Sequence, residues 1–90
     1  MTYRLLLSKK VSKFIASRSR KERGLIKRKL DMLSQNPIDH PLLDIKLLKS
    51  KDEFYRLRIN KYRFVYEIID NQLIVFIYTA GSRGDIYKKG

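Results

Sequence analysis

Cysteine is absent from this 90-residue sequence, and histidine occurs only once, as His40. The absence of cysteine excludes disulfide bonds, thiolate metal sites and cysteine nucleophiles. A single histidine argues against a zinc site and against a Ser-His-Asp triad. The nine carboxylates form no cluster of the kind that holds two metal ions. The sequence therefore predicts chemistry that uses no metal ion and no cofactor.

Long apolar runs are also absent. No stretch approaches the roughly 20 residues that a membrane-spanning helix needs. The apolar residues 5–7 are too few for the middle region of a signal peptide, and no small-residue cleavage site follows them. We therefore expect a cytoplasmic protein without a membrane partner. A chain of 90 residues has the size of one small domain, residues 1–90, with one modest core.

Positive charge is the strongest signal in the composition. Lysine and arginine number 21 against nine aspartates and glutamates, which gives a net charge of +12. A polyanion or an acidic protein is the natural partner of such a chain. Residues 1–36 carry 11 basic and two acidic groups, whereas residues 37–90 carry ten and seven. The first part predicts a general attraction for anions, and the second predicts basic groups at particular places.

The apolar pattern of the first half predicts a strand followed by a helical hairpin. Residues 3–7 read as the strand, and Ser8 can cap a helix after it. The spacing of Ser19 and Glu22 matches a capping box that opens a second helix. Pro37 ends that helix, because proline disfavours a helical residue before it. The expected apolar faces are Val11, Phe14 and Ile15 in the first helix and Leu25, Ile26, Leu30, Met32 and Leu33 in the second.

The second half predicts a linker and then a three-stranded antiparallel meander. Residues 38–44 read as irregular, and Leu47 and Leu48 lead back toward the core. The strands are residues 54–59, 62–69 and 73–79, with two-residue turns at 60–61 and 70–71. The last two strands are apolar on both faces, so we expect them at the centre of the sheet with the helices packed on one face. The predicted fold class is α+β, and residues 81–85 should turn the chain into a short tail.

Four arginines and one tyrosine are the residues most suited to bind an anion. Arg56 and Arg58 lie two residues apart on one strand and therefore leave the sheet on the same side. Arg63 follows the tight turn and lies close to Arg58 on the neighbouring strand. Arg83 comes after the last strand, and Tyr87 follows four residues later. If the tail folds back over the sheet, these side chains line one concave surface that suits phosphate, because each guanidinium donates two parallel hydrogen bonds.

Structural roles compete with this interpretation. Basic side chains on the wet face of a strand are usually only solvated, and they protect edge strands from aggregation. Arg63 interrupts an otherwise apolar strand, and a half-buried arginine needs an anionic partner. Glu67 lies four residues further along on the same face, so Arg63 could pair with Glu67 and not with a phosphate. Tyr87 could simply pack its ring on the sheet.

Two segments resemble the motifs of a known toxin superfamily. Residues 54–67, FYRLRINKYRFVYE, resemble the central motif of the RelE/ParE toxins, and residues 80–87, AGSRGDIY, resemble their closing motif. The Asn36-Pro37 pair followed by Lys46-Leu47 resembles the family's linker, with Lys49 or Ser50 where the family has glycine. The ending keeps the Arg and Tyr of RelE-like ribonucleases, which ParE-like gyrase inhibitors generally lack. The resemblance implies a RelE-like, microbial-RNase-like fold and the toxin of a type II toxin–antitoxin system.

That resemblance also implies an activity and roles for the residues. The activity is ribosome-dependent cleavage of mRNA in the A site, in which a 2′-hydroxyl attacks the adjacent phosphate. Arg63 and Arg83 would clamp that phosphate, and Tyr87 would stack on the nucleotide or deprotonate it. Arg56 and Arg58 stand where other members often have lysine. Because arginine does not readily lose its proton, Tyr87 is the candidate base.

The family implies a small RelB-like antitoxin as partner, besides the ribosome and mRNA. Apolar surface on the helical hairpin is the expected docking place for it. Two other functions stay open at this point. The chain could be a ParE-like inhibitor of DNA gyrase, which binds without cutting RNA. It could also be a non-enzymatic protein that binds the ribosome or RNA.

Overall fold

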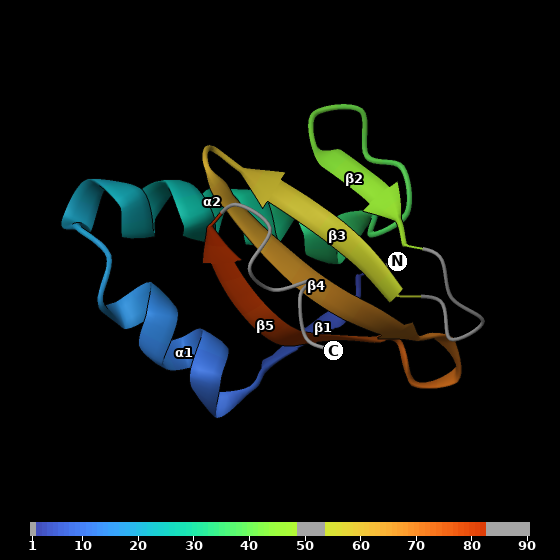
Figure 1. The fold of residues 1–90 in the computed structure, drawn as a ribbon. Helices are drawn as coiled ribbons and strands as arrows, with labels where there is room; N and C mark the ends of the chain where they lie inside the picture. Colours follow the sequence, from blue (N-terminus) through green and yellow to red (C-terminus); the bar gives the residue numbers. More distant parts are fainter. Residues whose placement is uncertain (1, 49–53, 83–90) are drawn as a thin grey trace.

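The computed structural model describes residues 2–48 and 54–82. Within these residues, two helices and five strands follow in the order β1 (Arg4–Leu7), α1 (Lys9–Ala16), α2 (Arg20–Gln35), β2 (Asp44–Leu47), β3 (Phe54–Ile59), β4 (Tyr62–Ile69) and β5 (Ile74–Ser82) (Figure 1). A short 3-10 helix, η1 (Asp70–Gln72), connects β4 to β5. The predicted α+β class is confirmed.

Both helices begin where serine side chains satisfy free backbone N–H groups. The Ser8 hydroxyl oxygen accepts the N–H of Val11 at 3.1 Å, and the Ser19 hydroxyl oxygen accepts the N–H of Glu22 at 3.1 Å. These are the two caps that the sequence predicts. The Glu22 carboxylate, which the capping box assigned to its own helix, accepts a hydrogen bond from the Tyr62 hydroxyl at 3.0 Å. Glu22 therefore ties α2 to the start of β4.

Arg18 also links the helical hairpin to the start of β4. Its guanidinium carbon lies 4.6 Å from the centre of the Phe14 ring and 5.2 Å from the centre of the Tyr62 ring. The guanidinium also donates a hydrogen bond to the Tyr62 hydroxyl at 3.0 Å. Cation–π contacts and charge-assisted hydrogen bonds of this kind each contribute on the order of 1 kcal/mol. The start of β4, next to Arg63, is thus held by both helices.

The five strands form one mixed sheet in the order β1-β5-β4-β3-β2. β1 runs parallel to β5, and the other neighbours are antiparallel. β4 and β5 occupy the central part of the sheet, as their apolar composition predicts. β2 corrects the sequence interpretation, which left residues 38–48 without a strand. Four residues are too few to give a clear pattern, and β2 forms because β3 supplies its hydrogen-bond partners.

Two further boundaries differ from the prediction. The chain between β4 and β5 forms η1 followed by Leu73 with a φ of 54°, so the connection is longer than the expected two-residue turn. β5 continues to Ser82, where the prediction had a turn from residue 81 onward. Pairing explains the difference, because Ser82 lies opposite Tyr62 and the ladder with β4 extends to that point.

A β-bulge interrupts the central ladder. Val65 pairs with Thr79 and Tyr66 pairs with Ile77, so Tyr78 is the extra residue of β5. A bulge re-aims the side chains around it, and bulges are over-represented beside functional sites. Because of this bulge, Ile77 and Ala80 both reach the buried side of the sheet although they lie three positions apart, an odd spacing that regular alternation would put on opposite faces.

The core lies between the helices and one face of the sheet. In Figure 1, α2 runs behind the sheet, and α1 packs against β5. Of the predicted helical faces, Val11, Ile26, Leu30 and Leu33 are buried, and the rest are half-buried.

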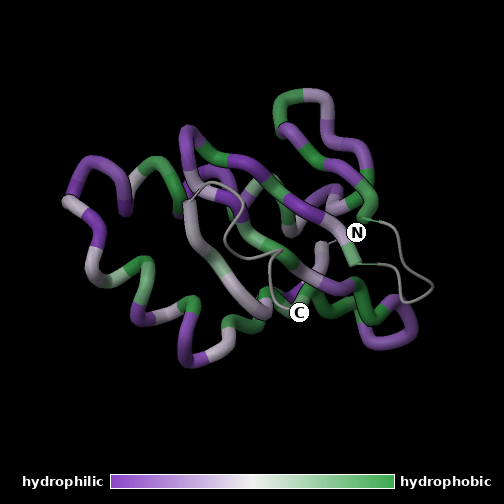
Figure 2. The backbone as a smooth tube through the Cα atoms, in the orientation of Figure 1, coloured by the Kyte–Doolittle hydropathy of each residue, from purple (hydrophilic) through white to green (hydrophobic). Residues whose placement is uncertain are grey.

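Neither helix of the described segments is long and apolar enough to cross a bilayer. Apolar and polar segments alternate along β3 in Figure 2, so the opposite face of the sheet is free to carry polar groups.

Candidate functional site

The face of the sheet opposite to the helices, here called the outer face, carries side chains in cross-strand rows. Directly paired residues on neighbouring strands point to the same face, so the register defines each row. The first row is Asp44, Arg58, Arg63 and Gly81; the second is Lys46, Arg56, Val65 and Thr79; the third is Phe54, Glu67 and Phe76. The first two rows concentrate the basic residues of the sheet.

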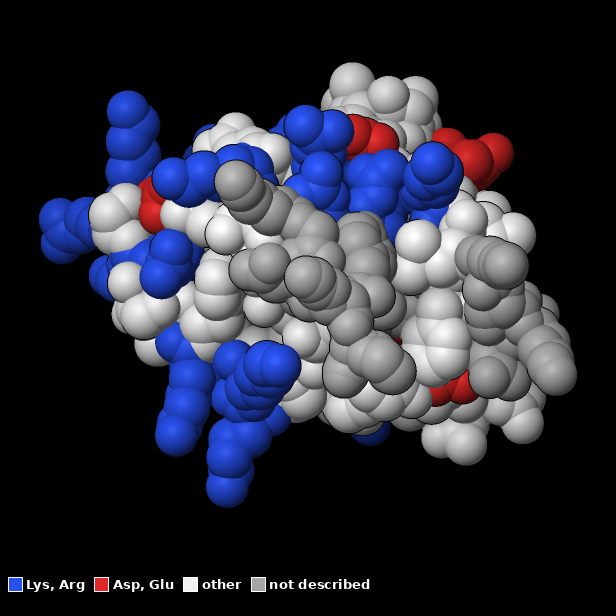
Figure 3. Space-filling model, viewed as in Figure 1, with Lys and Arg blue, Asp and Glu red and all other residues white. Residues whose placement is uncertain are grey.

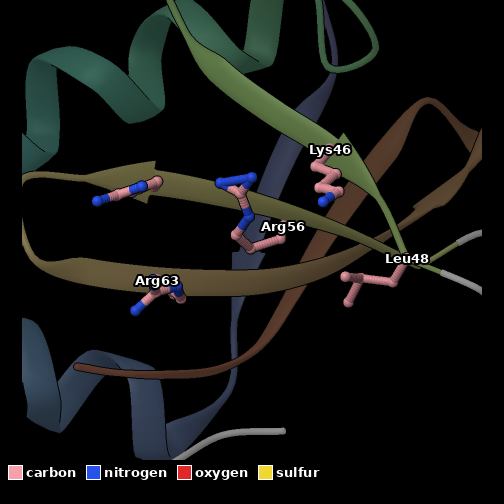
Figure 4. Close-up of a pocket in the computed structure, with 5 residues that line it drawn as sticks. Lys46, Leu48, Arg56 and Arg63 are labelled. Atoms are coloured by element: carbon pink, nitrogen blue, oxygen red, sulfur yellow. The ribbon is translucent and has the colours of Figure 1, made fainter. Parts of the chain in front are cut away.

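A pocket of about 380 Å³ opens over these two rows, and its lining includes four basic side chains. The lining residues are Lys46, Leu48, Arg56, Arg58 and Arg63. Figure 4 shows that Lys46, Arg56 and Arg63 come from three adjacent strands, β2, β3 and β4. On the surface viewed in Figure 3, Lys and Arg gather over β2 and β3. The sheet therefore presents a basic concave surface.

The cations of this pocket stand opposite one another. Arg58 pairs directly with Arg63, and Lys46 pairs directly with Arg56. Like charges in directly opposed positions destabilise a sheet, by an amount on the order of 0.2–1 kcal/mol for each pair. Folding alone does not favour such an arrangement, whereas an anion bound between the side chains would relieve the repulsion. The register thus indicates a site for an anion.

Asp44 holds one of these arginines at the rim. A terminal nitrogen of Arg56 lies 3.3 Å from the Asp44 carboxylate oxygen. The Arg56 side chain is only 11% exposed, whereas that of Asp44 is 55% exposed. The ion pair fixes the orientation of Arg56 and offsets part of the local charge. Arg58 is exposed and Arg63 is half-buried.

Glu67 was the alternative partner that the sequence offered for Arg63. Glu67 accepts a hydrogen bond from the Tyr78 hydroxyl. It lies two rows from Arg63, a separation of roughly 13 Å along an extended strand. Arg63 lines the pocket together with Arg58. The geometry therefore favours Arg63 as part of the anion site.

The structure brings together three of the five predicted site residues, Arg56, Arg58 and Arg63. Arg83 and Tyr87 lie outside the described residues. Sequence reasoning missed Lys46, which the short strand β2 brings opposite Arg56. The alternation from Asp44 to Leu47, polar then apolar twice, was the available signal.

Other titratable groups lie apart from the pocket. His40 is in the chain between α2 and β2, where its Nδ1 accepts the N–H of Leu42 at 3.1 Å. In residues 2–48 and 54–82, no group of three or more His, Cys, Asp or Glu side chains could hold a metal ion. The chemistry available in the described pocket is electrostatic binding of an anion by fixed cations.

Similarity to known proteins identifies the family of this chain. The family model of the ParE toxin of type II toxin–antitoxin systems matches residues 8–87. The chain belongs to this toxin family. The resemblance carried by residues 54–67 and 80–87 is thereby confirmed.

Individual relatives show that the chain is RelE-like. It is 39% identical over 59 residues to the curated RelE1 of Methanocaldococcus jannaschii, and this match spans 66% of each chain, just under two thirds of either length. RelE in the RelE–RelB complex of Pyrococcus horikoshii matches with a TM-score of 0.81 and 27% identity, covering 93% of this chain and 98% of that one. The isolated RelE toxin of E. coli matches with a TM-score of 0.70 and 26% identity, covering 94% and 90%. The predicted RelE-like fold is confirmed.

Proposed function

We propose that this RelE-like toxin is an endoribonuclease that cleaves mRNA in the ribosomal A site without a metal ion. One observation carries the proposal: three arginines and one lysine converge from three adjacent strands on a single pocket. Their directly opposed charges suit a site that binds the RNA backbone. The motif around Arg83 and Tyr87, which is typical of the RelE-like branch, supports RNA as the substrate.

The proposed reaction needs charge stabilisation above all. The 2′-oxygen loses its proton and attacks the adjacent phosphorus, the bond to the 5′-oxygen of the next nucleotide breaks, and that oxygen takes up a proton. The products are a 2′,3′-cyclic phosphate and a free 5′-hydroxyl. Negative charge grows on the phosphorus oxygens in the transition state, where preorganised donors act most strongly. Arg63 and Arg58 supply such donors.

Other residues of the site take supporting roles in this mechanism. Lys46 adds a fourth cation from β2, and Arg56, fixed by Asp44, adds a donor of constant orientation. Arg83 is proposed as a second clamp on the phosphate. Tyr87 is proposed to move the proton of the attacking hydroxyl, or to stack on its base. The last two assignments rest on the family motif.

A RelB-like antitoxin is the proposed protein partner. Two arguments support it: structural relatives form RelE–RelB complexes, and this chain has an apolar groove outside the basic pocket. The groove has a volume of about 420 Å³ and lies between β1 and the two helices, where Leu5, Leu7, Ile15, Ile26 and Leu30 contribute to its lining. An apolar antitoxin segment would fill it. We also propose that residues 1–90 act as one domain in the cytoplasm, where ribosomes and mRNA are available.

Cleavage on programmed ribosomes tests the proposed activity. Purified protein is added to ribosomes that hold a defined codon in the A site, and the mRNA is analysed by primer extension and by the chemistry of its ends. We expect a cut inside the A-site codon that leaves the cyclic phosphate and the 5′-hydroxyl. A DNA-gyrase supercoiling assay runs in parallel. Inhibited gyrase with intact mRNA would assign the ParE-like activity instead, and binding without a cut would assign a non-enzymatic role.

A further inference from the structure

An aromatic cluster lies on the outer face of the sheet, beside the basic pocket. The Tyr78 ring centre lies 5.4 Å from that of Phe54 and 4.4 Å from that of Phe76, and both contacts are edge-to-face. The Tyr78 hydroxyl donates a hydrogen bond to Glu67. Phe54, Glu67 and Phe76 form the third cross-strand row, and we call these three residues together with Tyr78 the aromatic row.

The β-bulge explains why Tyr78 joins this row. In a regular ladder Tyr78 would stand directly opposite Val65, but as the extra residue of β5 it lies outside the paired register. Its ring contacts and its hydrogen bond place it on the outer face beside Phe76. Tyr78 is 37% exposed, whereas Phe54 and Phe76 are half-buried. The backbone irregularity thus presents a partly exposed ring whose orientation two other rings fix.

The aromatic row is continuous with the basic pocket. Phe54 lies two residues from Arg56 on β3, a spacing of roughly 7 Å along the strand. The aromatic row therefore begins two residues along β3 from the proposed phosphate-binding cations, on the same face of the sheet. A nucleotide places its base a comparable distance from its phosphate, so a backbone held by the arginines would bring a base over the rings.

We propose that the aromatic row is a base-binding subsite for the nucleotide next to the bound phosphate. This inference rests on the proposed function, because it takes single-stranded RNA as the occupant of the pocket. The base stacks on Tyr78, as bases do on aromatic side chains of proteins that bind single strands. The rings are already ordered by their mutual contacts, so little conformational freedom is lost on binding.

Glu67 gives the subsite a chemical preference. Its Oε1 accepts the Tyr78 hydroxyl, and a carboxylate has acceptor positions for further donors. Adenine, cytosine and guanine carry an exocyclic amino group that donates, and uracil carries none. A glutamate that accepts from the cytosine amino group is a known form of base recognition. The subsite should therefore favour an amino-bearing base over uracil.

Binding of short RNA to the full chain tests the subsite. The probes are fluorescent hexanucleotides with 2′-O-methyl groups, which cannot be cleaved: one of cytidine, one of uridine and one with the same backbone but no bases. We expect the wild-type protein to bind the cytidine probe about tenfold more tightly than the abasic probe, since stacking contributes about 1–3 kcal/mol per base. The uridine probe should bind with intermediate affinity.

Four variants separate stacking, base preference and backbone binding. Tyr78→Leu should weaken cytidine binding by about five- to tenfold and leave abasic binding unchanged. Tyr78→Phe keeps the ring and should retain uridine binding, which shows that the fold tolerates change at this position. Glu67→Gln should bring cytidine binding close to uridine binding. As a matched control for the phosphate, Arg63→Ala should weaken all three probes alike.

The outcomes distinguish this inference from the proposed activity. Equal wild-type affinity for cytidine and abasic probes would overturn the subsite, and so would an equal loss for both probes in Tyr78→Leu. Cleavage on programmed ribosomes with no base preference would retain the nuclease and remove only the subsite. A clear base preference without any cleavage would retain the subsite and remove the nuclease.

Discussion

Arg63 shows at the scale of one residue how folding and function compete. It lies on the central strand β4 among buried aromatic and aliphatic residues, and directly opposite Arg58. A half-buried arginine directly opposite another arginine costs desolvation and like-charge repulsion. Both costs are reduced when a phosphate binds between the two guanidinium groups. The identity of this residue is therefore better explained by binding than by stability.

Replacing Arg63 with alanine should reduce mRNA cleavage strongly. Loss of one preorganised charge donor lowers a catalytic rate by roughly 10²- to 10³-fold, and we expect that range for Arg63→Ala on programmed ribosomes. Arg4→Ala is the matched control, because Arg4 is exposed on the opposite edge strand β1 and should cleave at the wild-type rate. Rapid cleavage by a folded Arg63→Ala variant would remove Arg63 from the mechanism.

The site residues differ in how well the sequence identifies them. Arg56 and Arg58 could be placed on one face because side chains in a strand alternate with a period of two. Arg63 followed from the tight turn, which brings it opposite Arg58. Lys46 could not be placed with the same certainty, because its position depends on pairing between β2 and β3 across residues that the pattern does not link. Local periodicity identifies which side chains share a face within one hairpin. It does not identify a side chain that another strand brings to the same face.

At the scale of an element, Tyr66 connects β4 to the chain that follows α2. Its hydroxyl donates a hydrogen bond to the Pro37 carbonyl at 2.7 Å, and its ring stacks on Tyr55 with centres 5.6 Å apart. Tyr66 is fully buried. Burial raises the pKa of the Tyr66 hydroxyl above its ordinary value of 10.0, because the phenolate would be desolvated.

This shift makes the stability of the protein depend on alkaline pH. Above pH 10 the unfolded chain releases the Tyr66 proton while the folded chain keeps it, so the free energy of unfolding falls as the pH rises. Tyr66→Phe should lower that free energy by about 1 kcal/mol at neutral pH, through loss of the hydrogen bond. Urea denaturation at pH 8, 10 and 11 should then show a shallower decline for the variant than for the wild type. Parallel declines would contradict the role of Tyr66.

The elements themselves were largely readable from the sequence. Both helices begin at the serines that the capping pattern indicated, because a cap is a local hydrogen bond between residues three apart. β3 and β4 also have the predicted bounds. The errors fall where distant pairing decides the structure: β2, the extension of β5 to Ser82, and the bulge at Tyr78. The prediction of a two-residue turn between β4 and β5 was wrong because the local turn signal is compatible with more than one loop length.

At the scale of the whole molecule, positive charge governs how strongly the protein attracts RNA. The net charge of +12 attracts any polyanion, whereas four basic residues of the described segments line the pocket. Each phosphate contact releases counterions and adds about −0.7 to the slope of log affinity against log salt for a single strand. The slope therefore measures how many basic groups touch the backbone.

Salt dependence of RNA binding should reflect the pocket and not the total charge. For the uncleavable hexanucleotides we expect a slope of about −3.5, which corresponds to the four cations of the pocket and the proposed contact of Arg83. Lys46→Ala should reduce its magnitude by about 0.7, and Arg4→Ala should leave it unchanged. The measurement is fluorescence anisotropy across a series of potassium chloride concentrations. A slope that Lys46→Ala leaves unchanged would exclude this lysine from the backbone contacts.

The sequence by itself determined the α+β class, the helical hairpin, the central strands, the strongly basic character and the family. Each of these follows from local patterns, from composition or from a contiguous motif. Only the tertiary structure decided which strands lie side by side, and hence that Lys46 joins the arginines and that Tyr78 joins Phe54 and Phe76. The physical reason is that pairing between distant segments sets the register, and a single added residue in β5 changes which face a side chain reaches.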